Sequence, residues 1–437
     1  MKLCKFSEPE YQSLVDVLVN RSSMDLFTQD EVVRKILNDV KEKGDEVVLR
    51  LTHQFDHHTL PLEKIRVTSD EIKAAYKKIS QEELDALREA ANRIRFFHER
   101  QKQDSWTYEE EGIVLGQMVK PLEIVGIYVP GGKASYPSSV LMNAIPAKVA
   151  GVERIVMCSP FPGGQTRPHV LVAADLAGVT EIYKIGGAQA VAAMAFGTDT
   201  IPRVDKIVGP GNIFVALAKR LVFGVVDIDM IAGPSEILIV ADHSANPSYV
   251  AADLLSQAEH DEDAVPILIT PDEALAEDVK KELEKQVKVL RKKDIAEISL
   301  KNNCYLLVTE SLQDALDIAN KIAPEHLELS LENPEEWAKK VRNAGAVFLG
   351  HYTPEAMGDY LAGPNHVLPT SGTARFSSPL GVYDFIKRTS LISYTKEALQ
   401  NCGKTVTLLA EMEDLGGHAN SVKLRLDGPE KGPEKKS

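Results

Sequence analysis

The pattern of apolar and polar positions divides the chain into a helical first part and an alternating part that follows it. Up to about residue 110, apolar residues recur at helical spacing, as in Leu87, Ala91 and Ile94, and Glu, Lys and Arg occupy the positions between them. This spacing predicts amphipathic helices that bury one face. Nothing in this first part points to catalysis.

Short β-rich runs alternate with helical runs from about residue 122 to residue 240. The strand-like runs begin near Ile124, Arg154, Glu181 and Lys206, at intervals of 25–30 residues. Such an interval accommodates one strand, one helix and their loops. The repetition therefore predicts a parallel sheet flanked by helices, as in a Rossmann-like domain.

Several of these strand-like runs end in glycine-rich turns. The turns are Val129-Pro130-Gly131-Gly132, Ile185-Gly186-Gly187-Ala188-Gln189 and Val208-Gly209-Pro210-Gly211-Asn212. Ligands of open α/β sheets settle at the carboxyl ends of the strands, so a nucleotide fits here. The dinucleotide signature G-x-G-x-x-G is incomplete, because Phe214 stands where its third glycine belongs. Left-handed turn residues that merely close the loops remain an equal alternative.

Composition narrows the range of partners and compartments. The chain has 437 residues, 44% of them hydrophobic and 26% charged, with a formal net charge of -14. These values indicate a soluble globular protein with more than one core, and the negative charge argues against nucleic acid and membrane partners. Cys4, Cys158, Cys304 and Cys402 form no Cys-x-x-Cys pair, and no signal peptide or apolar span is visible. We expect a cytoplasmic protein.

Candidate chemistry is concentrated in the last third of the chain. Two histidines and two carboxylates occur among Gly and Pro, in Pro324-Glu325-His326, Gly358-Asp359-Tyr360 and Gly363-Pro364-Asn365-His366. Functional groups are often carried on such turns, so we expect a reactive site. The structural alternative for Glu325-His326 is a helix that starts after Pro324.

A second set of candidate ligands lies on a probable helix. Gln257 and His260 are three residues apart, so both side chains rise from one face and can meet at one ion. A polar helix face is the alternative. Together with Glu325, His326, Asp359, His366 and His418, they offer oxygen and imidazole ligands without a thiolate, a set that suits zinc, or else manganese or cobalt. We interpret the histidines between His53 and His58 as a solvated loop and not as a metal cluster.

Long motifs between Val125 and His418 carry a resemblance to a known family. They are Tyr128-Val129-Pro130-Gly131-Gly132, Gly186-Gly187-Ala188-Gln189-Ala190, Gly209-Pro210-Gly211-Asn212, Ala232-Gly233-Pro234-Ser235-Glu236, Ser256-Gln257-Ala258-Glu259-His260, Pro324-Glu325-His326-Leu327, and Gly358-Asp359-Tyr360 through Gly372-Thr373-Ala374-Arg375-Phe376. In this order the motifs resemble the histidinol dehydrogenase family. The resemblance implies oxidation of histidinol to histidine in two NAD-dependent steps through a bound aldehyde.

The resemblance also implies roles for individual residues. His326 would take the alcohol proton in the first oxidation, and Glu325 would activate water in the second. One Zn²⁺ per subunit would be held by Gln257, His260, Asp359 and His418. NAD would contact Tyr128, Gln189 and Asn212, and the substrate would contact Ser235, Gln257, His260, His326, Asp359, His366, Glu413 and His418.

The family resemblance further implies an α/β fold with two Rossmann-like parallel-sheet domains, a helical N-terminal extension and a small C-terminal extension. The expected divisions are a helical segment at 1–21, a first α/β domain at 22–127 plus 238–380, an NAD domain at 128–237, and a dimerisation segment at 381–437 with a disordered tail. His418 would complete the partner's site in a homodimer.

Three rival functions remain open from the sequence. A related zinc- and NAD-dependent enzyme that oxidises another primary alcohol needs only different contacts to the substrate. A zinc hydrolase would use Glu325 to activate water, and a non-catalytic metal-binding protein would turn over no alcohol.

Overall fold

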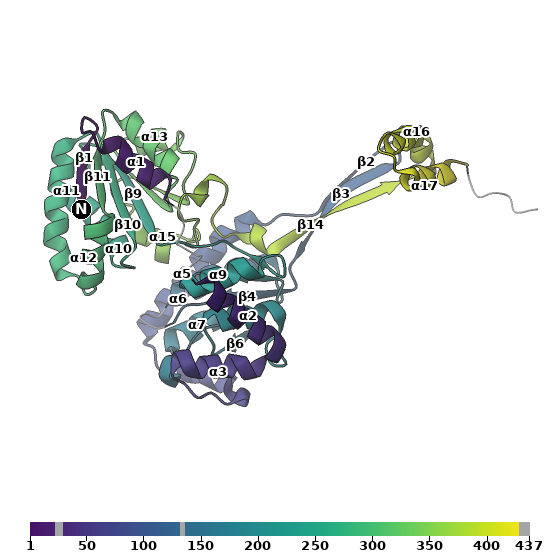
Figure 1. The fold of residues 1–437 in the computed structure, drawn as a ribbon, viewed down its shortest axis with the longest axis horizontal. Helices are drawn as coiled ribbons and strands as arrows, with labels where there is room; N and C mark the ends of the chain where they lie inside the picture. Colours follow the sequence, from purple (N-terminus) through teal and green to yellow (C-terminus); the bar gives the residue numbers. More distant parts are fainter. Residues whose placement is uncertain (22–28, 132–135, 428–437) are drawn as a thin grey trace, which may run out of the picture. The chain divides into compact units, whose positions relative to one another are not determined.

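The computed structural model describes residues 1–21, 29–131 and 136–427 (Figure 1). The chain forms two compact units, one of residues 1–102 and 122–385, the other of residues 103–121 and 386–437. None of the described helices has the length and apolar character that crossing a bilayer requires.

The first unit contains a six-stranded sheet in which every paired strand is parallel. Its order is β1 (Lys2–Lys5), β11 (Tyr305–Val308), β10 (Val265–Thr270), β9 (Glu236–Ala241), β12 (His326–Ser330), β13 (Ala346–Leu349). Ile237 and Ile239 belong to one apolar cluster, and the alternate residues Leu238 and Val240 belong to another. The sheet is thus buried on both faces, which explains why its strands read as continuous apolar runs.

Helices cover both faces of this sheet. The cluster around Ile237 is completed by α10 (Pro247–Ala258), α11 (Glu273–Gln286) and α12 (Lys293–Asn303), and the cluster around Leu238 by α1 (Tyr11–Val19) and α13 (Leu312–Ile322). Figure 1 shows α10, α11 and α12 beside β9 to β11. The short helices α14 (Pro334–Ala338) and α15 (Glu355–Tyr360) follow β12 and β13.

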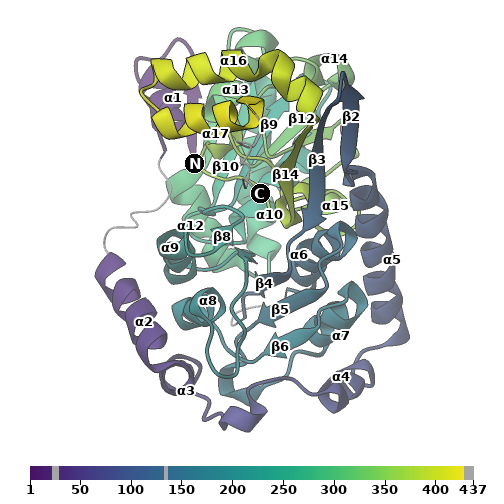
Figure 2. The same ribbon diagram turned by 90° about the vertical axis from the view of Figure 1, so that its right-hand side faces the viewer.

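The same unit contains a five-stranded parallel sheet, also seen in Figure 2. Its order is β6 (Glu181–Tyr183), β5 (Arg154–Cys158), β4 (Ile124–Tyr128), β7 (Lys206–Val208), β8 (Asp227–Ile228). Its connecting helices are α6 (Pro137–Ala150), α7 (Pro168–Ala177), α8 (Gly187–Phe196) and α9 (Ile213–Val222). The strands begin where the sequence pattern places them, and the α/β fold with two parallel sheets is confirmed.

Helices from residues 29–102 pack on the connecting helices α6 to α9 of the five-stranded sheet. The sequence-based division instead joined residues 22–127 to residues 238–380. The helices are α2 (Asp30–Lys43), α3 (Asp45–Asp56), α4 (Ser69–Tyr76) and α5 (Gln81–His98). Their apolar residues lie in the two clusters that also contain the side chains of β4 and β5. Because α3 extends to Asp56, part of the expected His53–His58 loop is helical. The expected helical segment 1–21 begins with the edge strand β1.

The second unit is a three-stranded antiparallel sheet followed by two helices. The sheet order is β14 (Ile386–Tyr394), β3 (Ile113–Pro121), β2 (Trp106–Glu110), and α16 (Lys396–Met412) packs against α17 (Gly416–Asp427). Within the expected dimerisation segment 381–437, β14 therefore pairs with residues 113–121, a partner that the sequence did not indicate. Its expected disordered tail covers residues 427–437. Asp427 is the last residue of α17, and residues 428–437 lie outside the described residues.

Candidate functional site

The candidate catalytic residues gather at the amino ends of β9 and β12. Glu236 is the first residue of β9, His326 is the first of β12, and His326 pairs in register with Ile237. The alternative of a helix that starts after Pro324 is therefore wrong, because the segment enters a strand. Helix α10 connects β9 to its parallel neighbour β10, so it runs back towards this edge, and Gln257 and His260 lie at its end.

His326 is held in one orientation by the backbone of the neighbouring strand. Its Nδ1 lies 2.9 Å from the carbonyl oxygen of Glu236, and its side chain is buried. A carbonyl only accepts, so Nδ1 carries the proton and Nε2 of the neutral ring keeps its lone pair. Burial lowers the pKa of His326 below its ordinary value, opposed in part by Asp359. The ring is therefore a neutral base around pH 7.

Glu325 lies beside this histidine with one oxygen fixed. The backbone N–H of Glu236 donates to Glu325 Oε2 at 2.8 Å, and the same oxygen lies 3.7 Å from His326 Nδ1. Burial raises the pKa of Glu325 well above its ordinary value, and the nearby carboxylates Glu236 and Asp359 act in the same direction. A carboxyl group in such surroundings is a stronger base than an exposed one.

The Glu236 carboxylate is hydrogen-bonded to Arg21, which was not among the sequence-based candidates. Arg21 donates to both carboxylate oxygens at 2.6 Å and to the carbonyl oxygens of Leu18 and Ile322 at 2.6 and 2.8 Å. The backbone N–H of Ser371 donates to the same carboxylate at 3.1 Å. No local motif surrounds Arg21, so the pairing across more than 200 residues gave no sequence signal.

Acidic groups of α15 face the other nitrogen of His326. Its Nε2 lies 3.7 Å from Glu355 Oε1 and 4.0 Å from Asp359 Oδ1, and Asp359 Oδ1 lies 3.6 Å from His366 Nδ1. Burial raises the pKa of Asp359, but its interaction with the neighbouring His366 outweighs burial and lowers that pKa to about 2. Ligand atoms of His326, Glu355 and Asp359 lie within 4.8 Å of one another. Glu355 was not among the sequence-based candidates, although it precedes Asp359 by one helical turn.

Gln257 has buried polar atoms that no described residue satisfies. Its side chain is wholly buried, and neither Oε1 nor Nε2 has a hydrogen-bond partner among the described residues. Buried amides are almost always satisfied, so this one calls for a group that the protein itself does not supply. The His260 residue is more exposed than Gln257. Partial burial of its imidazole lowers the pKa of His260, and the negative charge of Asp359 opposes that shift. Gln257, His260 and Asp359 therefore fit a divalent cation that prefers oxygen and imidazole ligands.

The expected NAD contacts lie at the carboxyl edge of the five-stranded sheet. Tyr128 ends β4 and its hydroxyl accepts from the Gly187 N–H at 3.0 Å, at the start of α8. Gln189 is buried, and its Oε1 has no hydrogen-bond partner in the described part of the chain. Asn212 caps α9 by accepting from the Val215 N–H at 3.2 Å.

Glycine is required at one of the turns of this edge. Gly209 has a φ of +112°, and an added Cβ would lie 2.1 Å from the carbonyl oxygen of Tyr128. Its N–H donates to Asp229 Oδ2 at 2.8 Å and its carbonyl accepts from Lys219 Nζ at 2.8 Å, while Asp229 and Lys219 form a buried ion pair. The turn is thus rigidly held, and both the structural and the nucleotide-binding interpretations of its glycines remain compatible with this geometry.

The remaining expected substrate contacts are divided between the two units. Ser235 immediately precedes β9, and its carbonyl accepts from the Val265 N–H at 3.0 Å. Glu413 and His418 belong to the second unit, where both are exposed. The structure thus brings together Gln257, His260, Glu325, His326, Asp359 and His366, and it leaves Glu413 and His418 as separate candidates.

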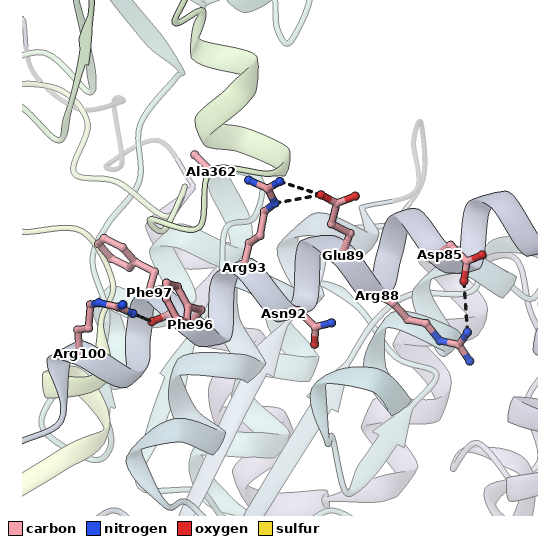
Figure 3. Close-up of a pocket in the computed structure, with 9 residues that line it drawn as sticks. All are labelled: Asp85, Arg88, Glu89, Asn92, Arg93, Phe96, Phe97, Arg100 and Ala362. Carbon is pink, nitrogen blue, oxygen red and sulfur yellow. Dashed lines mark hydrogen bonds and ion pairs between the residues drawn. The ribbon is translucent and has the colours of Figure 1, made fainter.

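A groove of about 880 Å³ along α5 contains none of these residues (Figure 3). Its arginines are engaged locally: Arg93 donates twice to Glu89, at 2.8 and 3.1 Å, and Arg88 donates to Asp85 at 3.3 Å. Ala362, shortly after α15, lies on its rim. We therefore assign the groove no role in catalysis.

Comparisons with known proteins agree on one family. A family profile described as histidinol dehydrogenase matches residues 19–426. Histidinol dehydrogenase from Syntrophotalea carbinolica is 53% identical over 98% of this chain and 99% of the relative, and that from Caldanaerobacter subterraneus subsp. tengcongensis is 58% identical over 93% and 94%. A crystal structure of histidinol dehydrogenase from Elizabethkingia anophelis superimposes with a TM-score of 0.92 at 40% identity, covering 98% of both chains.

Proposed function

Because the chain belongs to the histidinol dehydrogenase family of oxidoreductases, we propose that it oxidises L-histidinol to L-histidine through bound L-histidinaldehyde in two NAD-dependent steps. The observation that carries this proposal is the neutral, buried His326, whose Nε2 lies 4.0 Å from Asp359 Oδ1. The unsatisfied amide of Gln257, on the helix that ends at the same sheet edge, supports it. A proton acceptor and candidate metal ligands therefore lie at the same edge of the sheet.

Zinc is the proposed metal, one ion per subunit. Gln257, His260 and Asp359 would hold it together with His418 of the partner subunit, and the substrate's amino and imidazole nitrogens would complete the coordination. When bound, the ion supplies a fixed template that orients the alcohol, since zinc has no redox chemistry of its own. Manganese and cobalt are the alternatives that the same ligands accept.

Two bases serve the two oxidations. In the first, His326 Nε2 would take the proton of the alcohol hydroxyl, and in the second, Glu325 would take a proton from the water that adds to the aldehyde carbon. NAD, when bound, would supply the hydride acceptor of each oxidation, one molecule per step. The raised pKa of Glu325 supports this role, because a stronger base removes the water proton more readily.

The cofactor and the rest of the substrate are assigned by position. Tyr128, Gln189 and Asn212 would contact NAD, supported by their place at the carboxyl edge of the five-stranded sheet. Ser235, His326, His366, Glu413 and the metal-bound side chains would contact the substrate, with the Glu413 carboxylate facing a cationic group.

A cytoplasmic homodimer is the proposed assembly, with His418 donated to the partner's site. The second unit exposes many large apolar side chains for its size, which supports a covering partner. They include the following side chains, each at least half exposed: Trp106, Tyr108, Ile392, Leu408, Leu409 and Met412. All four cysteines lie in the described residues as free thiols, which fits a reducing compartment.

Removing and restoring the metal tests the proposal against its rivals. Chelated protein should form no NADH from histidinol, and added zinc should restore NADH formation, which is followed by its absorbance. A simple primary alcohol is the matched control and should react far more slowly. Equal turnover of the simple alcohol would reject histidinol as substrate, and hydrolase activity without NADH would favour the zinc hydrolase.

A further inference from the structure

Three elements carry the candidate metal and base side chains, and buried carboxyl groups connect them. Gln257 and His260 come from α10 and the residues after it, His326 from β12, and Asp359 from α15. Metal affinity depends on how these elements are spaced, because coordination tolerates little variation in ligand distance.

Glu328 connects β12 to α15. It lies two residues after His326, so both side chains leave the same face of the sheet. Its Oε1 accepts the backbone N–H of Glu355, the first residue of α15, at 2.8 Å. Both glutamates are almost completely buried. This hydrogen bond fixes the start of the helix that carries Asp359.

Asp253 connects the same glutamate to α10. It precedes Gln257 by four residues and therefore lies on the same side of the helix. The carboxyl groups of Asp253 and Glu328 lie close enough to share a hydrogen bond when one of them is protonated. Burial raises the pKa of Glu328 well above its ordinary value, and repulsion from Asp253 acts in the same direction.

Ser256 makes a second link between α10 and α15. Its hydroxyl lies 3.0 Å from Glu355 Oε2 and 2.7 Å from the carbonyl oxygen of Asp253. Two adjacent turns of α10 thus contact α15, one through Ser256 and one through the Asp253–Glu328 pair. The Asp253–Glu328 pair therefore connects two helices and does more than fill space in the core.

We propose that Glu328, braced by Asp253, is a positioning residue that sets the distance between the Gln257–His260 half-site and Asp359. The inference rests on the proposed function, since it takes these side chains as the ligands of one ion. Glu328 touches neither metal nor substrate; it acts through the start of α15 and the adjacent turn of α10.

Binding of Zn²⁺ alone to the full-length protein, measured by titration calorimetry, tests the inference. Glu328→Leu leaves the Glu355 N–H unsatisfied, so we expect zinc affinity to fall about 10- to 100-fold. Glu328→Gln keeps an acceptor for Glu355 and gains a donor to Asp253, so its affinity should stay within about threefold of wild type. NAD affinity should be unchanged in both variants.

Two further variants keep the test decisive. Ser299→Ala is the matched control, because it removes another buried hydrogen bond of the same sheet layer, from Ser299 Oγ to the Ala264 carbonyl at 2.9 Å, and should leave zinc affinity unchanged. Asp253→Ala removes the carboxyl group on α10 that contacts Glu328, at a partly buried position. This variant replaces Glu328→Leu in the test if Glu328→Leu does not fold.

Each outcome has one meaning. Wild-type zinc affinity in Glu328→Leu or Asp253→Ala would overturn the positioning role while leaving the proposed function intact. An equal loss in Ser299→Ala would also overturn it, because the effect would then be general destabilisation. Failure of the wild-type protein to bind zinc would overturn the proposed function and this inference together.

Discussion

Glu325 and His326 are neighbours in the chain, yet burial changes their protonation in opposite senses. It lowers the pKa of the imidazole and raises that of the carboxyl group. Both shifts favour the neutral form of the group, as desolvation always does. A neutral histidine accepts a proton readily near pH 7, and a carboxylate that resists ionisation binds a proton strongly once it is ionised. Two bases of unlike strength therefore suit the two different proton donors of the proposed reaction, the alcohol and the water.

Glu325→Gln should separate the two oxidations. The amide oxygen still accepts the Glu236 N–H, so the local structure is kept, but the base for aldehyde hydration is lost. We expect oxidation of histidinaldehyde to fall by at least about 100-fold and the first hydride transfer to fall much less. Single-turnover NADH formation from each substrate measures both. His326→Gln is the matched variant and should slow the first step; equal slowing of both steps in Glu325→Gln would contradict the assignment.

Arg21→Met tests the support beneath these bases. The change leaves the Glu236 carboxylate buried with one backbone donor, from Ser371, and removes two bonds at 2.6 Å. The free energy of unfolding should fall by about 3–5 kcal/mol, as measured by urea denaturation. Adding Glu236→Gln should restore part of this loss, because the uncompensated charge is then gone. A single variant as stable as the wild type would show that the ion pair is dispensable.

Among the secondary-structure elements, the order of strands was predictable and their long-range partners were not. β4 to β7 begin where regularly spaced apolar runs begin, because strands buried on both faces need continuous apolar sequence. The pairing of β3 with β14 joins residues more than 260 apart, and neither strand is buried on both faces. Periodicity within a segment carries no information about such a partner.

The candidate site shows the same limit. Glu325, His326 and Asp359 stand in unusual motifs among Gly and Pro and were identified as candidates from the sequence. The glycine turns indicated the sheet edge where we propose that NAD binds. Arg21, Glu328 and Asp253 act through tertiary contacts that no spacing rule encodes. The assignment of residues 22–127 to the first domain differs from the packing for a similar reason, because amphipathic helices do not specify which sheet their apolar face covers.

Lys219→Met should loosen the glycine turn that begins at Gly209. It removes the donor to the Gly209 carbonyl and leaves Asp229 buried without its cation. We expect NAD affinity to fall about tenfold along with stability, measured by nucleotide titration and by thermal unfolding. Lys206→Met is the matched control, since this buried lysine pairs with Asp227 and Asp384 and lies at the start of β7, away from the turn. An equal loss of NAD affinity in the control would contradict a local role.

The two compact units imply different tasks for the molecule as a whole. The larger unit contains both parallel sheets with the base and nucleotide candidates, and the smaller one carries Glu413 and His418 on exposed helix ends beside apolar surface. In the homodimer that we propose, a closed two-fold assembly would bury that surface and bring His418 of the partner subunit to each site. The site within a single chain would then lack the one ligand that the partner supplies.

Mixing two inactive variants tests this sharing. His326→Ala removes the base of its own site, and His418→Ala removes the ligand that it would give to its partner. If His418 acts across the interface, each mixed dimer has one intact site, so subunit exchange should restore about a quarter of wild-type activity. Refolding each variant alone is the control. No recovery from the mixture would mean that His418 serves its own chain or no site at all.

The most direct measurement is the number of NADH molecules formed for each histidinol consumed by the zinc-loaded protein. Paired bases beside one bound substrate predict two NADH and histidine as the only product, with no free aldehyde trapped by an added carbonyl reagent. One NADH with release of the aldehyde would contradict the account.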